Sequence, residues 1–519
     1  MRRIALFVLG SLFFLFSKSQ PIDVQHYEYN LALTDQSDLV IARATVKIKF
    51  LATSSQFNLD LASIENGKGM EATGVFENGL PVSFTHQNNK LIIYTSAKQG
   101  DVKSYDIQYG GIPKDGLIIS KNKYGDRTFF ADNWPNRAHH WIPCNDRPDD
   151  KASFEFTVTA PSHYRVISNG LKTDERDIGN GMKLTHWKED TPLPTKVMVI
   201  GVAKFAIKEF TDSPPGIPVS GWVYPQDSTN GFRDYAPATE ILKFFSDYIA
   251  PYPYQKLANV QSKTIFGGME NASAIFYSES SVTGNPAAVE DLLAHEIVHQ
   301  WFGNMASEKS FAHLWLSEGF ATYLTNIYLE KKYGKEILKQ RMGDDRKLVV
   351  QFARQTNTPV VDSISPLMDL LNANSYQKGG WVLHMLRNEV GDSAFHKIIQ
   401  TYYRQFKGGN ADTRDFETIA EKVSGKELTW FFDQWLYWPG IPQLMIERSV
   451  EKNEAKIRIT QRGRKFTFPL EITIVRTDGS TLKETIAVND QFIEYKIKVP
   501  DIKLVIVDPD TKLLFAEVK

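Results

Sequence analysis

Two histidines one helical turn apart constrain this sequence more than any other feature. His295 and His299 stand in "HEIVHQWFGN", and we expect a helix here because Asn285-Pro286 is a typical start and Gly303 a typical stop. Side chains four residues apart leave the same face of a helix, so the two imidazoles could hold one Zn²⁺ at about 2.1 Å each. Glu296 would lie beside that metal, where it could take a proton from a water that the metal activates.

A third ligand distinguishes a zinc site from a chance pattern. His-Glu-x-x-His alone arises by chance in about one chain in a hundred of this length and histidine content. Eighteen residues separate His299 from Glu318, which stands in "LWLSEGFATYL" at the start of a helical stretch that we expect to run to about residue 333. A carboxylate from an adjacent helix would leave the fourth position free for water. The sequence therefore predicts one zinc ion bound by His295, His299 and Glu318.

Hydrophobic periodicity divides the rest of the chain into three parts. Residues 20–226 carry strand signals such as "ATVKIKF", in which apolar residues and lysines alternate, and they predict an all-β domain. Residues 227–440 change to helical spacing. Residues 441–519 return to strands, with Asp478-Gly479 as a hairpin signal, and predict a small β-sandwich. The predicted fold class is therefore multidomain α+β, with a mainly helical domain between two β domains.

The first residues have the layout of a secretory signal peptide, which we assign to residues 1–19. Arg2-Arg3 precede an apolar run over 4–16, and small residues follow at Ser17 and Ser19. This run is too short to span a bilayer, although a retained membrane anchor is the alternative. No later apolar stretch is long enough to span. We therefore expect an exported protein, periplasmic or extracellular, with no stable membrane span after cleavage.

Charge and cysteine usage exclude several classes of protein. The 60 basic and 61 acidic side chains give a formal net charge of −1, so no strong field attracts nucleic acid or an anionic membrane. Cys144 is the single cysteine, which leaves no internal disulfide. An unpaired cysteine is more often a small buried apolar residue than a nucleophile.

Three further motifs accompany the zinc pattern. "WIPCNDRPDDKASF" occupies residues 141–154, "GGMEN" residues 267–271 and "SYQKGG" residues 375–380. Together with His-Glu-x-x-His and Glu318, they resemble the gluzincin zinc aminopeptidases, the family of aminopeptidase N and leukotriene hydrolase. The resemblance implies a thermolysin-like catalytic domain over 227–440. It is a resemblance to a short member, without the large helical C-terminal domain of the longer ones.

The resemblance also implies roles for individual residues. The "GGMEN" segment would form the strand that binds substrate, with Gly267, Gly268, Met269, Glu270 and Asn271. The Glu270 carboxylate would bind the ammonium of a free N-terminus, which is largely cationic at neutral pH. Many members carry alanine where Gly268 stands. Tyr376 would donate a hydrogen bond to the developing oxyanion, and Glu296 would act first as base and later as acid.

One position departs from the pattern of the family. Members usually have a Gln-x-Glu pair shortly before the Pro-Cys block, and its glutamate gives a second contact to the substrate amine. This chain has Asp132-Asn133-Trp134 in that place. Asp132 could supply the missing charge and is our candidate for substrate binding, while Trp134 could instead contact the cation through its ring. A purely structural role for both is the remaining possibility.

The sequence thus predicts a secreted zinc-dependent aminopeptidase that hydrolyses the N-terminal residue from peptide substrates with a free N-terminus. A zinc endopeptidase is one alternative, which the missing second glutamate favours and the "GGMEN" strand opposes. A catalytically silent peptide-binding protein is another. It would need a defective site, yet the zinc ligands, Glu296 and Tyr376 are all present.

Overall fold

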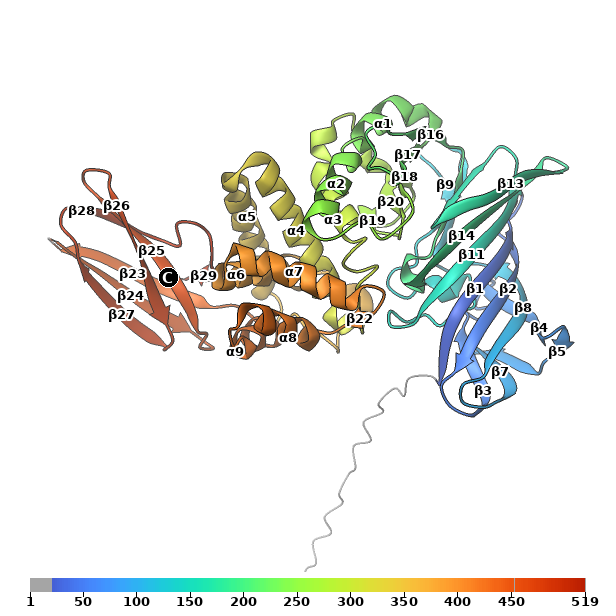
Figure 1. Ribbon diagram of the computed structural model, residues 1–519, viewed down its shortest axis with the longest axis horizontal. Coiled ribbons are helices and arrows are strands. Elements are labelled where there is room, and N and C mark those ends of the chain that lie inside the picture. The colour runs from blue at the N-terminus through green and yellow to red at the C-terminus, as the bar shows by residue number, and fades with distance from the viewer. Residues whose placement is uncertain (1–20, 452, 519) are drawn as a thin grey trace, which may run out of the picture.

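A computed structural model describes residues 21–451 and 453–518, so the predicted signal peptide at 1–19 lies outside the described residues. The described chain is elongated, with a β region, a helical region and a second β region in a row (Figure 1). This order confirms the predicted fold class. Within the described part, no helix combines the length and the apolar character needed to cross a membrane.

The N-terminal region is built around an eight-stranded sheet in the order β13-β14-β11-β1-β2-β8-β4-β5, in which β1 and β11 pair in parallel. The alternation predicted from "ATVKIKF" is confirmed in β2, where Val46, Ile48 and Phe50 are buried and the lysines between them exposed. The strand bounds are β1 Ile22–Ala32, β2 Val40–Phe50, β4 Gly69–Glu77, β5 Leu80–Pro81, β8 Val102–Ile112, β11 Lys151–Pro161, β13 Leu171–Gly179 and β14 Met182–Pro194.

Two smaller sheets complete this region, in the orders β12-β15-β10-β9 and β3-β7-β6. Their bounds are β3 Ser54–Asp60, β6 Phe84–Gln87, β7 Lys90–Ala97, β9 Leu117–Lys121, β10 Arg127–Ala131, β12 Arg165–Ser168 and β15 Ile200–Ala203. Strand β10 matters for the site, because it pairs with β9 and β15 and ends directly before Asp132. The segment from Asp132 to Trp134 therefore leaves a well-anchored strand.

A mixed five-stranded sheet follows, in the order β16-β17-β18-β20-β19. Its bounds are β16 Ala206–Glu209, β17 Val219–Val223, β18 Leu257–Ser262, β19 Gly268–Met269 and β20 Ala274–Ser278. The edge strand β19, antiparallel to β20, holds the "GGMEN" segment. Strands β16 and β17 precede residue 227, so this sheet extends across the predicted boundary between residues 226 and 227. The division into domains at that boundary stays a prediction.

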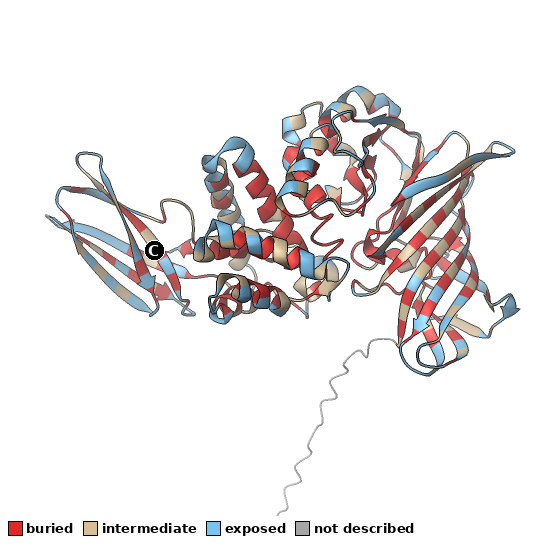
Figure 2. Cartoon of the chain, viewed as in Figure 1, coloured by how far each residue is buried: buried red, intermediate tan, exposed pale blue. Residues whose placement is uncertain are grey.

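The helices pack around α4, whose residues from Trp315 to Leu329 are almost all buried (Figure 2). This helix confirms the stretch predicted to end near Tyr333. The helix bounds are α1 Ser228–Tyr235, α2 Ala238–Tyr248, α3 Glu290–Val298, α4 Trp315–Tyr333, α5 Lys335–Ala353, α6 Gly379–Val390, α7 Asp392–Phe406, α8 Thr413–Ser424 and α9 Thr429–Phe432. The short strands β21 Ser307–Glu308 and β22 Asn410–Ala411 pair beside them.

The helix with the two histidines is shorter than predicted. It does not begin at Pro286, because residues 286–288 form a 3₁₀ turn that the Asn285 side chain does not cap, and α3 starts only at Glu290. It also ends well before Gly303. A turn takes over after His299, in which the Ala306 N–H bonds back to the Trp301 carbonyl. The two histidines nevertheless remain one helical turn apart.

The C-terminal region is a small β-sandwich of two sheets, ordered β27-β24-β23-β29 and β26-β25-β28. The predicted hairpin signal Asp478-Gly479 lies between β25 and β26 as expected. The bounds are β23 Gln443–Glu451, β24 Glu454–Arg462, β25 Phe468–Arg476, β26 Thr481–Val488, β27 Phe492–Lys498, β28 Ile502–Val507 and β29 Ala516–Glu517. Arg346 of α5 ties this sandwich to the helices, since its guanidinium pairs with Asp508 and donates to the Leu513 carbonyl at 2.7 Å.

Candidate active site

The three predicted zinc ligands meet at one point between α3 and α4. The Nε2 atoms of His295 and His299 are 3.2 Å apart, and each lies 3.3 Å from Oε2 of Glu318. Ligand atoms at about 2.1 Å from a tetrahedral zinc are about 3.4 Å from one another, so the three atoms have nearly the spacing that such a zinc requires. Among the described residues this is the one group of three or more His, Cys, Asp and Glu side chains that could hold a metal ion.

The ring of His299 is oriented by the turn that follows α3. Its Nδ1 lies 3.0 Å from the Phe302 carbonyl oxygen and 3.1 Å from Oγ of Ser317. Because a carbonyl only accepts, Nδ1 carries a proton, which leaves Nε2 as the atom that would bind a metal after losing its own proton. Gly303 permits this packing, since it has φ +109° and a Cβ there would lie 2.3 Å from Oγ of Ser317.

The charges around the ligands favour a cation. Glu270, Glu296 and Glu318 are all buried, and all three line the same cavity. Burial opposes ionisation of Glu318, but His299 and His295 lower the pKa of its carboxyl well below the usual range. Burial likewise opposes protonation of His299, while these carboxylates raise the pKa of its imidazole to about 10. Two imidazoles and an ionised carboxylate are the donor set that zinc prefers, so the residues present fit that metal.

Glu296, also on α3, faces the same cavity as the ligands. Burial and the neighbouring Glu270 and Glu318 carboxylates raise its pKa well above the usual range, so this carboxyl binds a proton more tightly than an exposed glutamate does. Its carboxylate packs over the backbone of Gly268, where an added Cβ would lie 2.2 Å from Oε1. Glu296 thus occupies the space that an alanine at position 268 would fill.

Tyr376 reaches the site from a π-helical turn, Asn374–Lys378, that leads into α6. Its ring stacks beside that of His295, with the centroids 5.9 Å apart and the planes 13° apart. The turn is held against α4 by direct backbone contact. A Cβ on Gly319 of α4 would lie 2.8 Å from the carbonyl carbon of Gly379, so these two glycines let the helices approach closely.

Glu270 follows the edge strand β19 and lines the cavity. Two side chains hold its backbone, because Gln300 and Asn304 donate to its carbonyl oxygen at 2.8 and 2.7 Å. The side chain is only 5% exposed, and its Oε1 has no hydrogen-bond partner within the described structure. Burial raises the pKa of the Glu270 carboxyl, and a cationic group of a ligand would favour its ionised form.

The structure brings most but not all of the predicted substrate-binding residues to the cavity. Its volume is about 270 Å³, and it is lined by Trp134, Phe266, Gly267, Gly268, Met269, Glu270, Leu292, His295, Glu296, Glu318, Leu371 and Tyr376. Asn271 is fully buried outside this lining. Asp132 is also outside it, because its oxygens accept hydrogen bonds from Arg137 at 2.8 Å and from the Thr264 hydroxyl at 3.1 Å. Trp134 is the residue of that segment that reaches the cavity.

Three lining residues were not predicted from the sequence. Phe266 precedes the "GGMEN" segment, Leu292 lies on α3 one turn before His295, and Leu371 belongs to the loop before Tyr376. The neighbouring motifs are the only signal that could have found them. An apolar side chain beside a motif is ordinarily part of the core, so sequence alone does not separate a cavity wall from packing.

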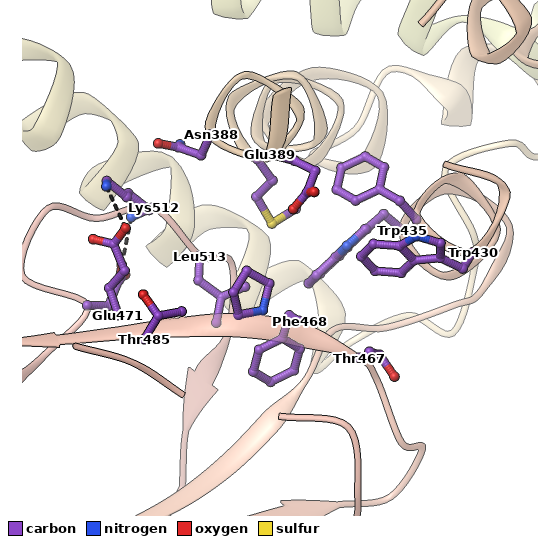
Figure 3. A pocket seen from close by; sticks show the side chains of 14 residues that line it. Asn388, Glu389, Trp430, Trp435, Thr467, Phe468, Glu471, Thr485, Lys512 and Leu513 are labelled. Carbon is purple, nitrogen blue, oxygen red and sulfur yellow. Dashed lines mark hydrogen bonds and ion pairs between the residues drawn. The ribbon is translucent and has the colours of Figure 1, made fainter. Parts of the chain in front are cut away.

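A second cavity, of about 80 Å³, lies between α6, α9 and the C-terminal sandwich and shares no lining residue with the first (Figure 3). Trp430, Trp435 and Phe468 line it together with charged residues. The charges are already paired, since Lys512 donates to Glu471 at 2.7 Å and Lys426 donates to Glu389 at 2.6 Å. These charged side chains therefore already have partners within the protein.

Comparison with known families gives matches over most of the chain. The "Peptidase M1 N-terminal domain" matches residues 23–197, and the "Peptidase family M1 domain" matches residues 234–435. The first match includes Trp134, and the second includes all three zinc ligands.

Individual relatives agree with these matches. The chain is 27% identical over 498 residues to "Probable aminopeptidase 2" of Sulfurisphaera tokodaii, covering 88% of this chain and 62% of that protein. It is 29% identical over 333 residues to glutamyl aminopeptidase of Rattus norvegicus, covering 61% and 35%. Legionella pneumophila aminopeptidase A in complex with aspartic acid has the same fold, with a TM-score of 0.83 and 16% identity over 97% of this chain and 60% of that one. This chain thus spans less than two thirds of the length of these relatives.

Proposed function

Since the chain belongs to peptidase family M1, we propose that it is a zinc-dependent aminopeptidase that hydrolyses the N-terminal residue from peptides. The Glu270 carboxylate is the observation that carries this proposal. It lines the same cavity as the zinc ligands, and its Oε1 has no partner within the described chain. A free α-amine is largely cationic at neutral pH and would complete this site.

The residues around the cavity divide the chemistry between them. Zn²⁺ held by His295, His299 and Glu318 would act as a Lewis acid and lower the pKa of a water. Glu296 would accept the proton of the attacking water and later transfer it to the leaving amine. The Tyr376 hydroxyl would donate to the carbonyl oxygen of the scissile peptide as negative charge develops there. Glu270 would fix the ammonium and thereby select the bond after the first residue.

The size of the cavity supports this function over an endopeptidase. A cavity of about 270 Å³ is smaller than the roughly 300–1,000 Å³ of pockets that take a drug-sized ligand. This volume suits the single residue that stands on the N-terminal side of the scissile bond. A silent peptide-binding role is supported less, because His295, Glu296, Glu318 and Tyr376 line this cavity, and His299 lies beside Glu318 at 3.3 Å.

Export forms part of the same proposal and rests on the signal-peptide pattern of residues 1–19. Its test is N-terminal sequencing of the protein recovered from the cell envelope and the medium. A mature N-terminus near Gln20 would support export. Recovery inside the cell with the first nineteen residues still attached would contradict it.

The function is tested by comparing an amino-acid amide that has a free α-amine with its N-acetylated counterpart. The zinc-loaded protein should cleave only the free amine, and a chelator should abolish the reaction. Glu270→Gln should lower kcat/KM for the free amine by about 10²-fold, because it removes one charge of a buried ion pair. The exposed Glu65→Gln serves as control and should change nothing. Equal cleavage of both substrates would instead indicate an endopeptidase, and cleavage of neither would indicate a silent protein.

A further inference from the structure

The cavity over the zinc ligands has an apolar side that the chemistry above does not use. Its members come from separate segments of the chain and are Trp134, Phe266, Met269, Leu292 and Leu371. Trp134 is only 3% exposed, and its ring meets Phe266 and Phe311 edge-on at centroid distances of 6.0 and 5.9 Å. Aromatic contacts of this kind fix the orientation of a ring. The indole is therefore a rigid wall of the cavity.

The surroundings of this wall supply no positive charge to a ligand. No lysine or arginine is among the described residues that line the cavity. Arg137 is close in sequence, but its guanidinium pairs with Asp132 and Asp115 at 2.8 and 2.9 Å, and its Nε donates to the Trp134 carbonyl at 2.7 Å. An acidic side chain placed against Trp134 would thus lose its hydration without gaining a cationic partner, since the unpaired indole N–H of Trp134 is a neutral donor.

The Asp132 carboxylate near this wall already has hydrogen-bond partners. Asp132 directs Oδ1 to Arg137, while Oδ2 accepts from the Thr264 hydroxyl and from the Ile265 N–H at 3.1 and 3.0 Å. It therefore does not take the place of the glutamate that the family pattern has before the Pro-Cys block. Glu270 is left as the carboxylate for the ammonium, and the Trp134 ring is left for another part of the substrate.

We propose that Trp134 and Phe266 receive the side chain of the N-terminal residue and make the protein selective for large apolar residues over acidic ones. This inference rests on the proposed function and names its substrate class. An apolar side chain gains by leaving water for the aromatic wall, and contacts of that kind distinguish substrates by about 10–200-fold. Position 134 would then determine specificity, where related proteins use a glutamate to bind the amine.

Four amides with Phe, Leu, Ala or Glu at the N-terminus test this inference. Wild type should cleave the Phe and Leu amides with kcat/KM about 10–100-fold above the Ala amide, and the Glu amide more slowly than the Ala amide. Trp134→Ala should lower kcat/KM for Phe and Leu at least tenfold but change that for Ala less than threefold. Trp134→Phe should keep the preference. Trp430→Ala, in the remote cavity, is the matched control and should leave the order of substrates unchanged.

The outcomes separate this inference from the proposed function. Calorimetric binding of phenylalanine amide and of glutamate amide reads the preference without turnover, so tighter binding of phenylalanine amide would uphold the inference even if no amide were cleaved. If no amide were cleaved, the proposed aminopeptidase function would be overturned, but the inference about Trp134 would not. An equal loss for all four amides in Trp134→Ala would assign Trp134 to the amine or to the fold and overturn the inference. Faster cleavage of the Glu amide than of the Leu amide in wild type would overturn it too.

Discussion

Tyr376 keeps its hydroxyl proton over the working pH range of most enzymes. Burial is the main cause, and the Glu318, Glu270 and Glu296 carboxylates add to it, so the pKa of the phenol lies well above its ordinary value. Tyr376→Phe should therefore lower kcat by about 10²–10³-fold through the loss of one oxyanion donor. KM and the zinc content should change little. Steady-state kinetics with metal analysis check this, and a loss of activity below threefold would contradict the role of Tyr376.

Single residues also show where sequence-based prediction succeeds and where it stops. The two histidine ligands were predictable because helical spacing alone brings His295 and His299 together. The choice between Asp132 and Trp134 was not. It depends on Thr264, which lies 132 positions later and binds the Asp132 carboxylate in the folded protein. Burial and pairing of this kind are properties of the fold and leave no local pattern.

At the level of elements, the contact between α4 and α6 sets the position of Glu318 against Tyr376. Gly319→Ala would place a Cβ 2.8 Å from backbone atoms of Gly379, which cannot move cheaply. The substitution should lower the free energy of unfolding by about 1–3 kcal/mol and weaken zinc binding, because Glu318 is the adjacent residue. Urea unfolding and zinc titration measure both effects.

A matched control exists on α5. Gly343 is also a helical glycine, but a Cβ there meets no atom within 4 Å. Gly343→Ala should raise the free energy of unfolding by about 0.5–1 kcal/mol, because alanine is the better helix former. If Gly319→Ala raised the free energy of unfolding as Gly343→Ala does, the close approach of α4 and α6 would not contribute to stability.

The link between β1 and the start of β11 should make stability depend on pH. Asp150 accepts from the Val24 N–H of β1, and burial, with smaller contributions from Asp23 and Asp149, raises the pKa of its carboxyl to about 7. An unfolded aspartate has a pKa near 3.9, so the native state binds more protons between about pH 4 and 7. The contribution of Asp150 to stability is therefore largest below pH 4 and is lost as the pH rises through 7.

Asp150→Asn removes this titration. Relative to wild type, the variant should gain on the order of 2 kcal/mol in free energy of unfolding between pH 5 and pH 8. Urea unfolding at the two pH values measures the difference. A variant that differs from wild type by the same amount at both pH values would show that Asp150 does not titrate in this range.

Elements also differ in how well the sequence predicts them. The alternating strand β2 and the long helical stretch of α4 were both predicted, because each pattern extends over many residues. The predicted start of α3 was wrong, since Asn285-Pro286 has the composition of a cap but Asn285 makes no capping hydrogen bond. The parallel pairing of β17 with β18 was not predicted either, because it joins segments separated by α1 and α2.

On the scale of the whole molecule, a buried ion pair joins the N-terminal β region to the helical region. Lys196, between β14 and β15, pairs with Glu308 of β21, and their side chains are 1% and 0% exposed. Lys196→Met would leave a buried carboxylate unpaired, which should cost about 3–5 kcal/mol in free energy of unfolding. The double variant Lys196→Met/Glu308→Gln should regain part of that loss. Thermal unfolding of both variants checks this, and equal loss in both would contradict a paired role.

The central claim is that one zinc ion, held by His295, His299 and Glu318, makes the folded chain an aminopeptidase. The most direct test removes metal with a chelator and then titrates Zn²⁺ back while amide hydrolysis is followed. The account predicts no activity without metal, recovery that ends at one zinc per chain, and no such recovery in Glu318→Ala. Full activity of the metal-free chain, or unchanged recovery in Glu318→Ala, would contradict it.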